Sequence, residues 1–399
     1  MKYILLFPLL FMAFSCHKGT KIKNYNISTK VDKQLAGEIL LSKDDHCYFY
    51  DLKITDNFYL FLDQKSDTIL RVYKQDNLFT LHNSSCRSSG KDKLWKPLFT
   101  KEIQTNSNDK DITFLVDENQ YYKDITLNNQ NSDIKINTSK LLNLRNVSGR
   151  DFNITTKEVY AIPVNRDSKS PFFFFNPDSG FYWVDPSPSV EKVMPKDVLS
   201  YINTICLNES QNAVVSACRF TNFVSFYELN GTLKTTVKFG NTPIVPVISP
   251  NQIGIDIRNT TKCFTYICGT PQYVYCLYDG SSDFTTPSKI VVFQWNGKHI
   301  ATWQTDRILQ TIAVDKEDKF VLAIASNDNG QDIIKYDLKQ NTNSTMRNEF
   351  FHVESVQTPL GDMDSQKEIA ATEKFPIIWK SVDPYTEKFR WNRFLKVIH

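Results

Sequence analysis

The six histidines are the side chains best suited to acid–base or metal chemistry, but their spacing supports neither use. No two lie within five positions of each other, so the H-E-x-x-H and H-x-H patterns are absent. The closest two glycines, Gly231 and Gly240, lie nine residues apart, which excludes the G-x-G-x-x-G turn and the Walker loop. No G-x-S-x-G nucleophile elbow occurs either. The sequence therefore predicts no catalytic residue, no bound metal and no cofactor.

Three charged residues at the ends of predicted strands could bind a ligand: Arg87, Asp306 and Arg307. If the strands surround a channel, the loops at their ends converge on it, and we predict these residues at the channel mouth. The alternative is that each residue caps a turn or forms a surface ion pair, which contributes about 0 to 1 kcal/mol to stability.

The segment Ser326-Asn-Asp-Asn-Gly330 matches the first half of the Asp-box, S-x-D-x-G-x-[ST]-W, which recurs in sialidase-like propellers. Asp332 and Ile333 stand where Ser/Thr and Trp belong, and no second copy occurs. In those folds the box braces a hairpin, because its side chains bond to turn amides. The segment therefore predicts a hairpin and not a catalytic site.

The first sixteen residues are typical of an export signal. Met1-Lys2 is a short positive region and Tyr3 to Phe14 is almost continuously apolar. Twelve helical residues reach roughly 18 Å, which is less than the ~30 Å hydrocarbon core of a bilayer. We therefore predict a signal peptide over residues 1–15 and no membrane-spanning helix.

Ala13-Phe14-Ser15-Cys16 resembles the lipobox of bacterial lipoproteins, in which the chain is cut before a cysteine that is then acylated. The resemblance implies that lipid on Cys16 anchors the protein to a membrane, followed by a polar and basic tether over residues 16–35. No Asp follows Cys16, which by analogy with enteric sorting favours the outer membrane, on its periplasmic or its surface side. The alternative is a cleaved secretory peptide with an incidental cysteine.

Seven cysteines remain beyond Cys16, so at least one cannot pair within the chain. Their spacing includes no C-x-x-C and places no histidine nearby, which argues against zinc. We predict that they are small apolar residues within strands.

The composition favours strands and argues against a nucleic-acid partner. Aromatic residues make up 13% of the 399-residue chain, and such residues favour strands. Lys and Arg number 47 against 44 Asp and Glu, so the basic excess of a nucleic-acid-binding protein is missing.

Strands with an aromatic residue recur along the chain. Asn230-Gly231 and Asn296-Gly297 each follow an apolar run, which predicts a hairpin with a type I′ turn. The six related strands carry Tyr73, Tyr122, Trp183, Tyr227, Phe293 and Tyr336. Their average spacing of about 53 residues suits one four-stranded propeller blade with insertions. We therefore predict an all-β fold, a six-bladed β-propeller over residues 36–340; two β-sandwiches are the alternative.

Four segments near the end of this region resemble the last blades of TolB-like six-bladed propeller lipoproteins of Bacteroidetes: Tyr273-Val-Tyr-Cys-Leu-Tyr-Asp-Gly280, Val292-Phe-Gln-Trp-Asn-Gly297, Asp306-Arg-Ile308 and Ile312-Ala-Val-Asp315. Cys86-Arg-Ser-Ser-Gly90 is a poorer match to that family's glycine-rich turn, because Cys86 replaces its first glycine. The resemblance implies a propeller fold at the cell envelope and no particular activity.

The last 59 residues, 341–399, differ from the repeats and predict a short helical extension. Ser365-Gln-Lys-Glu368 is a capping box that starts one helix. Asp383-Pro384 starts a second helix with an apolar face at Trp391, Phe394, Leu395 and Ile398. This helix could dock on the propeller, lie on an anionic membrane, or be an accident of sequence without fixed structure.

Two functions are compatible with these features. The favoured one is a non-enzymatic, lipid-anchored binding or scaffold module for a protein or glycan partner. The alternative is an envelope enzyme, a glycan hydrolase or lactonase, with a loop-built site in the propeller channel. An enzyme should gather carboxylates with perturbed pKa values at one end of the channel.

Overall fold

The computed structural model describes part of one compact unit, Met1–Leu338, and a second unit begins at Lys339. The second unit, Cys16 and Arg87 lie outside the described residues, and so do the predicted C-terminal helices. The described residues are 22–44, 47–65, 67–75, 77–86, 94, 97–101, 110–116, 121–128, 134–141, 153–155, 160–163, 170–176, 178–194, 202–249, 254–327 and 330–338.

The described strands form six separate sheets in chain order. The first three are four-stranded. The first sheet contains β4 (Phe49–Ile54), β5 (Phe58–Asp63), β6 (Thr68–Lys74) and β7 (Asn77–Cys86). The second contains β8 (Leu98–Phe99), β9 (Lys110–Val116), β10 (Tyr121–Asn128) and β11 (Ile134–Leu141). The third contains β12 (Asn153–Ile154), β13 (Tyr160–Pro163), β14 (Phe172–Asn176) and β15 (Gly180–Trp183). The short helix α1 (Pro188–Glu191) follows the third sheet.

The last three sheets each gain an outer strand from the N-terminal region. The fourth sheet contains β16 (Asn203–Asn208), β17 (Ala213–Cys218), β18 (Phe223–Tyr227) and β19 (Leu233–Phe239), with β1 (Lys23–Ile27). The fifth contains β20 (Phe264–Gly269), β21 (Tyr273–Tyr278), β22 (Lys289–Gln294) and β23 (His299–Thr305), with β2 (Lys33–Leu35). The sixth contains β24 (Leu309–Val314), β25 (Phe320–Asn327) and β26 (Gly330–Asp337), with β3 (Glu38–Asp44). β1 and β2 pair in parallel and β3 pairs antiparallel.

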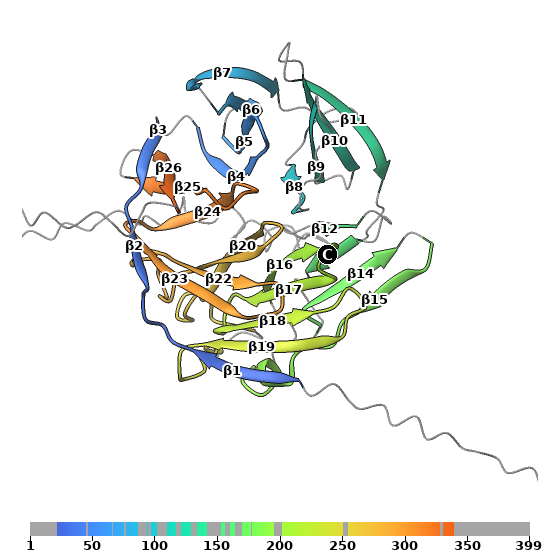
Figure 1. The fold of residues 1–399 in the computed structure, drawn as a ribbon, viewed down its shortest axis with the longest axis vertical. Helices are drawn as coiled ribbons and strands as arrows, with labels where there is room; N and C mark the ends of the chain where they lie inside the picture. Colours follow the sequence, from blue (N-terminus) through green and yellow to red (C-terminus); the bar gives the residue numbers. More distant parts are fainter. Residues whose placement is uncertain are drawn as a thin grey trace, which may run out of the picture. The chain divides into compact units, whose positions relative to one another are not determined.

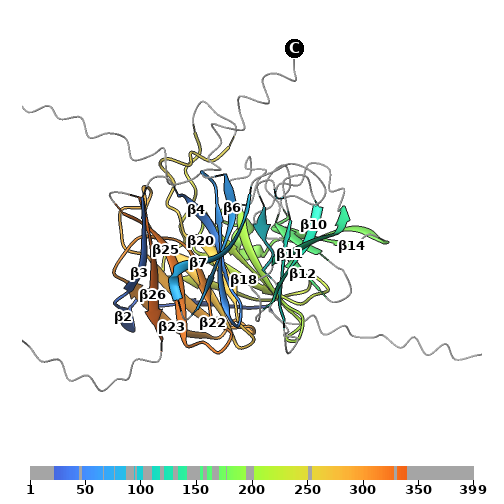
Figure 2. The same ribbon diagram turned by 90° about the horizontal axis from the view of Figure 1, so that it is seen from above.

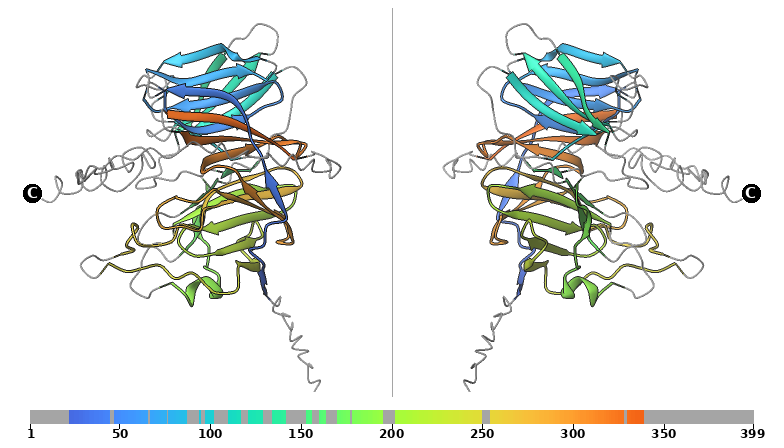
Figure 3. Two further views of the ribbon diagram at one scale, coloured as in Figure 1. Left: turned by 90° about the vertical axis from the view of Figure 1, so that its left-hand side faces the viewer. Right: turned by 90° about the vertical axis from the view of Figure 1, so that its right-hand side faces the viewer.

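The sheets follow one another around a common centre, which is the arrangement of a β-propeller (Figure 1). Their first strands lie innermost: β12 contacts β16, β16 contacts β20, β20 contacts β24, β24 contacts β4, and β4 contacts β8. Neighbouring sheets pack face to face, and the N-terminal segment runs along their outer edges (Figure 3, blue). The connection between β19 and β20 stands out on one side of the sheets (Figure 2, dark yellow).

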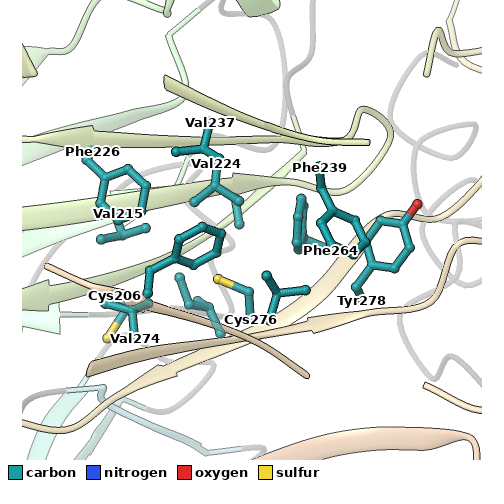
Figure 4. Packing of buried hydrophobic residues seen from close by; sticks show 14 of the residues in the cluster. Cys206, Val215, Val224, Phe226, Val237, Phe239, Phe264, Val274, Cys276 and Tyr278 are labelled. Atoms are coloured by element: carbon teal, nitrogen blue, oxygen red, sulfur yellow. The ribbon is translucent and has the colours of Figure 1, made fainter. Parts of the chain in front are cut away.

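The apolar core is divided into layers between adjacent sheets. One layer joins the β16–β19 and β20–β23 sheets and contains Val224, Phe226 and Val274 (Figure 4). The Phe226 ring contacts the Phe293 ring there, with centroids 5.5 Å apart. Cys206 and Cys276 are buried in this layer. Burial also raises the pKa of the Cys218 thiol to about 12, which keeps it protonated. Cys206, Cys218, Cys263 and Cys276 are buried, as expected for small apolar residues in the core.

The predicted strands are present, but one was assigned to the wrong place in its sheet. Tyr73, Tyr227, Phe293 and Tyr336 lie in the third strands of their sheets, as does Tyr122. Trp183 lies in β15, the fourth strand, and the third strand is β14. The sequence prediction erred here because both strands are rich in aromatics. In β15 these side chains are about half exposed: Phe181, Tyr182 and Trp183.

The two predicted Asn-Gly hairpins are confirmed, but their turn type is not I′. Only the glycines have positive φ, 85° at Gly231 and 89° at Gly297. The Gly231 N–H donates to the Glu228 carbonyl at 2.9 Å, and the ladder shifts register after Phe226. These features indicate a type I turn followed by a glycine bulge, which needs only one left-handed residue.

Part of the predicted tether is ordered structure. β1 and β2 both lie within residues 16–35 and pair with β19 and β23. The polar composition of this region hid the strands, because their backbone bonds do not depend on apolar side chains.

The ring closes where the last sheet meets the first. β3 pairs with β26, so the N-terminal region completes the last sheet. The buried Gln331 side chain, 1% exposed, also bonds to the backbone of β4. Its Oε1 accepts from the Phe49 N–H at 2.6 Å and its Nε2 donates to the Phe49 carbonyl at 2.8 Å. The β4 ladder is irregular between Phe49 and Asp51, so this amide satisfies groups at a bulge.

We expect Gln331→Ala to lower the free energy of unfolding by about 2 to 4 kcal/mol, because two buried backbone groups of Phe49 lose their partner. Urea unfolding followed by circular dichroism measures the loss. Gln34→Ala, at an exposed position of β2, serves as the control and should change little. Equal stabilities of the two variants would contradict a role of Gln331 in closure.

Candidate binding site in the propeller channel

A pocket of about 90 Å³ opens between the innermost strands of four sheets. Its walls come from β4, β20 and β24, from residues just after β8, and from the turns that follow β20 and β24. Three of the described lining residues are lysines, Lys53, Lys101 and Lys316, and none of the described lining residues is acidic. The pocket therefore combines an apolar strand wall with positive charge.

The lysines are held by different partners. The Lys53 side chain is buried, and its Nζ donates to the Thr100 carbonyl at 2.9 Å. Lys101 Nζ lies 3.8 Å from the centroid of the Tyr266 ring, a cation–π contact that links residues of two sheets. Lys316 Nζ is 2.7 Å from Asp56 Oδ1 at a partly exposed position, where ion pairs contribute little.

Asp51 lies next to this pocket and is almost completely buried. Its carboxylate accepts hydrogen bonds from Tyr266 Oη, the Phe99 N–H and the Leu52 N–H, each at 3.0 Å. Burial raises the pKa of Asp51 to about 6, although the positive charge of Lys101 and these hydrogen bonds act in the opposite direction. The side chain thus ties β4 to β20 and to the β8 segment at the wall of the channel.

Asp306 and Arg307, predicted at the channel mouth, lie on the connection from β23 to β24. Asp306 accepts from Tyr336 Oη at 2.8 Å and from the Gly37 N–H at 3.3 Å, and Arg307 Nη1 lies 2.8 Å from Asp332 Oδ2. Asp332 also accepts from Ser42 Oγ at 2.6 Å, so this network fastens β3 to β26. Neither residue is among those lining the pocket. Their role in binding a ligand stays a prediction, and Arg87 lies outside the described residues.

Sequence reasoning missed Asp51, Lys53, Lys101 and Tyr266. A signal was present for two of them: Asp51 and Lys53 alternate within an otherwise apolar strand, and charged residues are rarely buried without partners. Lys101 follows a two-residue strand and carries no comparable pattern. Tyr266 is one of many aromatics, so only the folded arrangement singles it out.

Two further properties concern metals and membranes. Within the described part of the chain, no group of three His, Cys, Asp or Glu side chains could hold a metal ion. Over the same ranges, no helix is long and apolar enough to cross a bilayer.

Comparisons with known proteins yield distant structural likenesses. No protein-family model and no curated protein matches the chain. A Bacteroides fragilis NCTC 9343 protein described as exported is 12% identical with a TM-score of 0.45, over 79% of this chain and 99% of that one. U3-55K is 9% identical with a TM-score of 0.43, over 76% of this chain and 98% of that one. The β-propeller domain of Myceliophteria thermophila Cps50 (Swd1) is 8% identical with a TM-score of 0.39, over 75% of this chain and 99% of that one.

The raised pKa of Asp51 predicts a pH-dependent effect of Asp51→Asn. A folded-state pKa of about 6, above the usual value of 3.8, gives stability that is complete below pH 4 and is lost as the pH rises through 6. The asparagine does not titrate, so the stability of the variant relative to the wild type should rise by about 2.4 kcal/mol between pH 4 and pH 7. Urea unfolding of both proteins at each pH measures this difference in the free energy of unfolding. The same difference at every pH would contradict a raised pKa of Asp51.

Proposed function

We propose that the chain is a lipid-anchored envelope protein whose six sheets are the six blades of a TolB-like propeller, acting as a binding or scaffold module for a protein or glycan partner. The observation that carries the proposal is the channel pocket, in which three lysines and a tyrosine ring converge without an acidic lining residue among those described. Such a pocket suits an anionic group of the partner, a carboxylate above all.

The construction of the pocket supports binding. Its walls are the innermost strands of four sheets, which are held by ladders and by buried side chains such as Lys53 and Asp51. A site built on strands needs little ordering when a ligand enters, so less free energy of binding is lost. Lys101, on the face of the Tyr266 ring, is the lysine best placed to meet an anion while keeping its position.

The anchor would hold this site close to a membrane. Six residues separate Cys16 from Lys23, where β1 begins, and the seven steps between them, at ~3.4 Å each, span at most about 24 Å. Because β1 is fixed on β19, we propose that acylated Cys16 keeps the propeller against the outer membrane, on its periplasmic or its surface side.

The second candidate is an envelope enzyme, a glycan hydrolase or lactonase, and Asp51 is the observation that favours it. A buried carboxyl with a pKa of about 6 beside a lysine and a tyrosine has the properties of a general acid. Its oxygens, however, already accept three hydrogen bonds that join strands, which is what a structural carboxylate does. We therefore place binding first.

The anchor is tested by Cys16→Ser. Without an acylated cysteine the protein loses its lipid, so we expect it in the soluble fraction after cell fractionation, while the wild type stays with the membranes. Radioactive palmitate labelling of the wild type but not of the variant is the second readout. Membrane retention of the variant would contradict lipid anchoring.

The channel site is tested by Lys101→Met in the Cys16→Ser protein. Poly-L-glutamate and polygalacturonate serve as acidic peptide and acidic glycan probes in titration calorimetry, and we expect affinity for one of them to fall about tenfold or more. Lys30→Met, at an exposed position, is the matched control. Breakdown of polygalacturonate that Asp51→Asn abolishes would favour the enzyme instead.

A further inference from the structure

A second pocket shares no described lining residue with the channel pocket and has different chemistry. It measures about 350 Å³, within the range of about 300 to 1,000 Å³ common for small-ligand sites. Its lining residues are Gln211, Gln272, Tyr273, Gln294, Trp295 and Asn296. They come from three turns in two neighbouring sheets, those that join β16 to β17, β20 to β21 and β22 to β23.

Four of these six side chains are carboxamides and none is charged. A carboxamide offers two donor hydrogens and a carbonyl acceptor, so it can pair with a hydroxyl group in either direction. In the described part of the chain, the side-chain amides of Gln211, Gln272 and Gln294 make no hydrogen bond to protein. Three amide groups are thus available to a ligand at one pocket.

The two aromatic residues contribute the apolar part of a mostly polar lining. Trp295 is only 5% exposed, and its Nε1 donates to the Thr270 carbonyl at 3.0 Å, so the indole is fixed. Tyr273 is half-buried, and its ring meets Tyr275 edge to face at 6.5 Å. Small-molecule sites combine such aromatic side chains with polar groups that fix the orientation of the ligand.

The turns that carry the amides are themselves well determined. The Tyr273 N–H donates to Thr270 Oγ1 at 3.0 Å, which fixes the turn that contains Gln272. The Asn212 N–H donates to the Glu209 carbonyl at 3.1 Å in the turn of Gln211. The third turn is fixed by the bond from the Gly297 N–H to the Gln294 carbonyl at 2.9 Å. The backbone that carries each glutamine side chain is therefore held in place by hydrogen bonds within its turn.

We propose that this amide pocket binds a neutral saccharide. The sugar ring would lie against Tyr273 and Trp295, and the sugar hydroxyls would pair with the glutamine amides. The absence of charge among the described lining residues favours a neutral sugar over the acidic ligands that suit the channel. The inference deepens the proposed role as a binding module, but it depends neither on the lipid anchor nor on the channel lysines.

The test uses the Cys16→Ser protein and titration calorimetry with neutral hexasaccharides: maltohexaose, laminarihexaose, xylohexaose, mannohexaose and chitohexaose. We expect at least one to bind with a Kd of about 1 mM or tighter. Gln211→Ala and Gln272→Ala should each weaken that binding by about fivefold or more. Both side chains are exposed and make no bond within the described chain, so their removal should leave the melting temperature unchanged.

Two matched controls separate this site from the channel. Gln34→Ala removes an exposed glutamine elsewhere and should bind the sugar as the parent does. Lys101→Met should also bind it normally, even where its affinity for acidic probes has fallen. If Lys101→Met abolishes sugar binding while the glutamine variants retain it, the ligand belongs to the channel, and this inference fails while the proposed function stands.

Other outcomes would overturn the inference directly. These are the absence of binding to all five hexasaccharides at about 10 mM, and unchanged binding by the Gln211→Ala/Gln272→Ala double variant. A third outcome is that no sugar binds the parent protein and that the double variant loses the binding of a protein partner. The pocket would then belong to a protein partner, and the saccharide proposal would be refuted.

Discussion

The closure between the last sheet and the first is the interaction on which the rest of the structure depends. Each sheet buries its faces against its neighbours, and the layer that joins Phe49 and Phe61 to Leu322 and Ile333 forms only when the last sheet meets the first. β3 supplies the outer strand of the last sheet, and Gln331 bonds to both backbone groups of Phe49. The channel pocket is lined by β4 and β24, which flank this junction, so its shape follows from the same closure.

Polar side chains have different tasks in the inner and outer parts of the propeller. Near the channel, Asp51 and Lys53 cross between sheets, and their hydrogen bonds offset the cost of burying charge. Farther out, the Asp306, Arg307 and Asp332 network fastens β3 to β26. The amide pocket differs from both, because its glutamines leave their amides open to a ligand. Asp51, Lys53 and the Asp306 network thus position strands, whereas the glutamine amides of the second pocket make no hydrogen bond to the described protein.

Sequence reasoning located strands better than it located sites. Tyr73 and Tyr336 mark third strands because aromatic residues with apolar neighbours are a local signal. The same signal cannot separate β14 from β15, since both are aromatic, nor reveal β1, whose pairing is a backbone property. Lys101 and Tyr266 meet only after two sheets are in place, and the three glutamines come from separate turns. Such sites depend on distant residues, which no local pattern records.

The pairing of the first strands with the last sheets also has a kinetic consequence. Ser42 and Asp332 bond across 290 positions of sequence, so the closing contact joins segments that leave the ribosome far apart in time. Such non-local contacts slow folding, because a long loop must be ordered before they form. Until β2 pairs with β23 and β3 pairs with β26, the outer edges of β23 and β26 stay open to other strands. The interval before closure is therefore the period in which this protein most needs protection from aggregation.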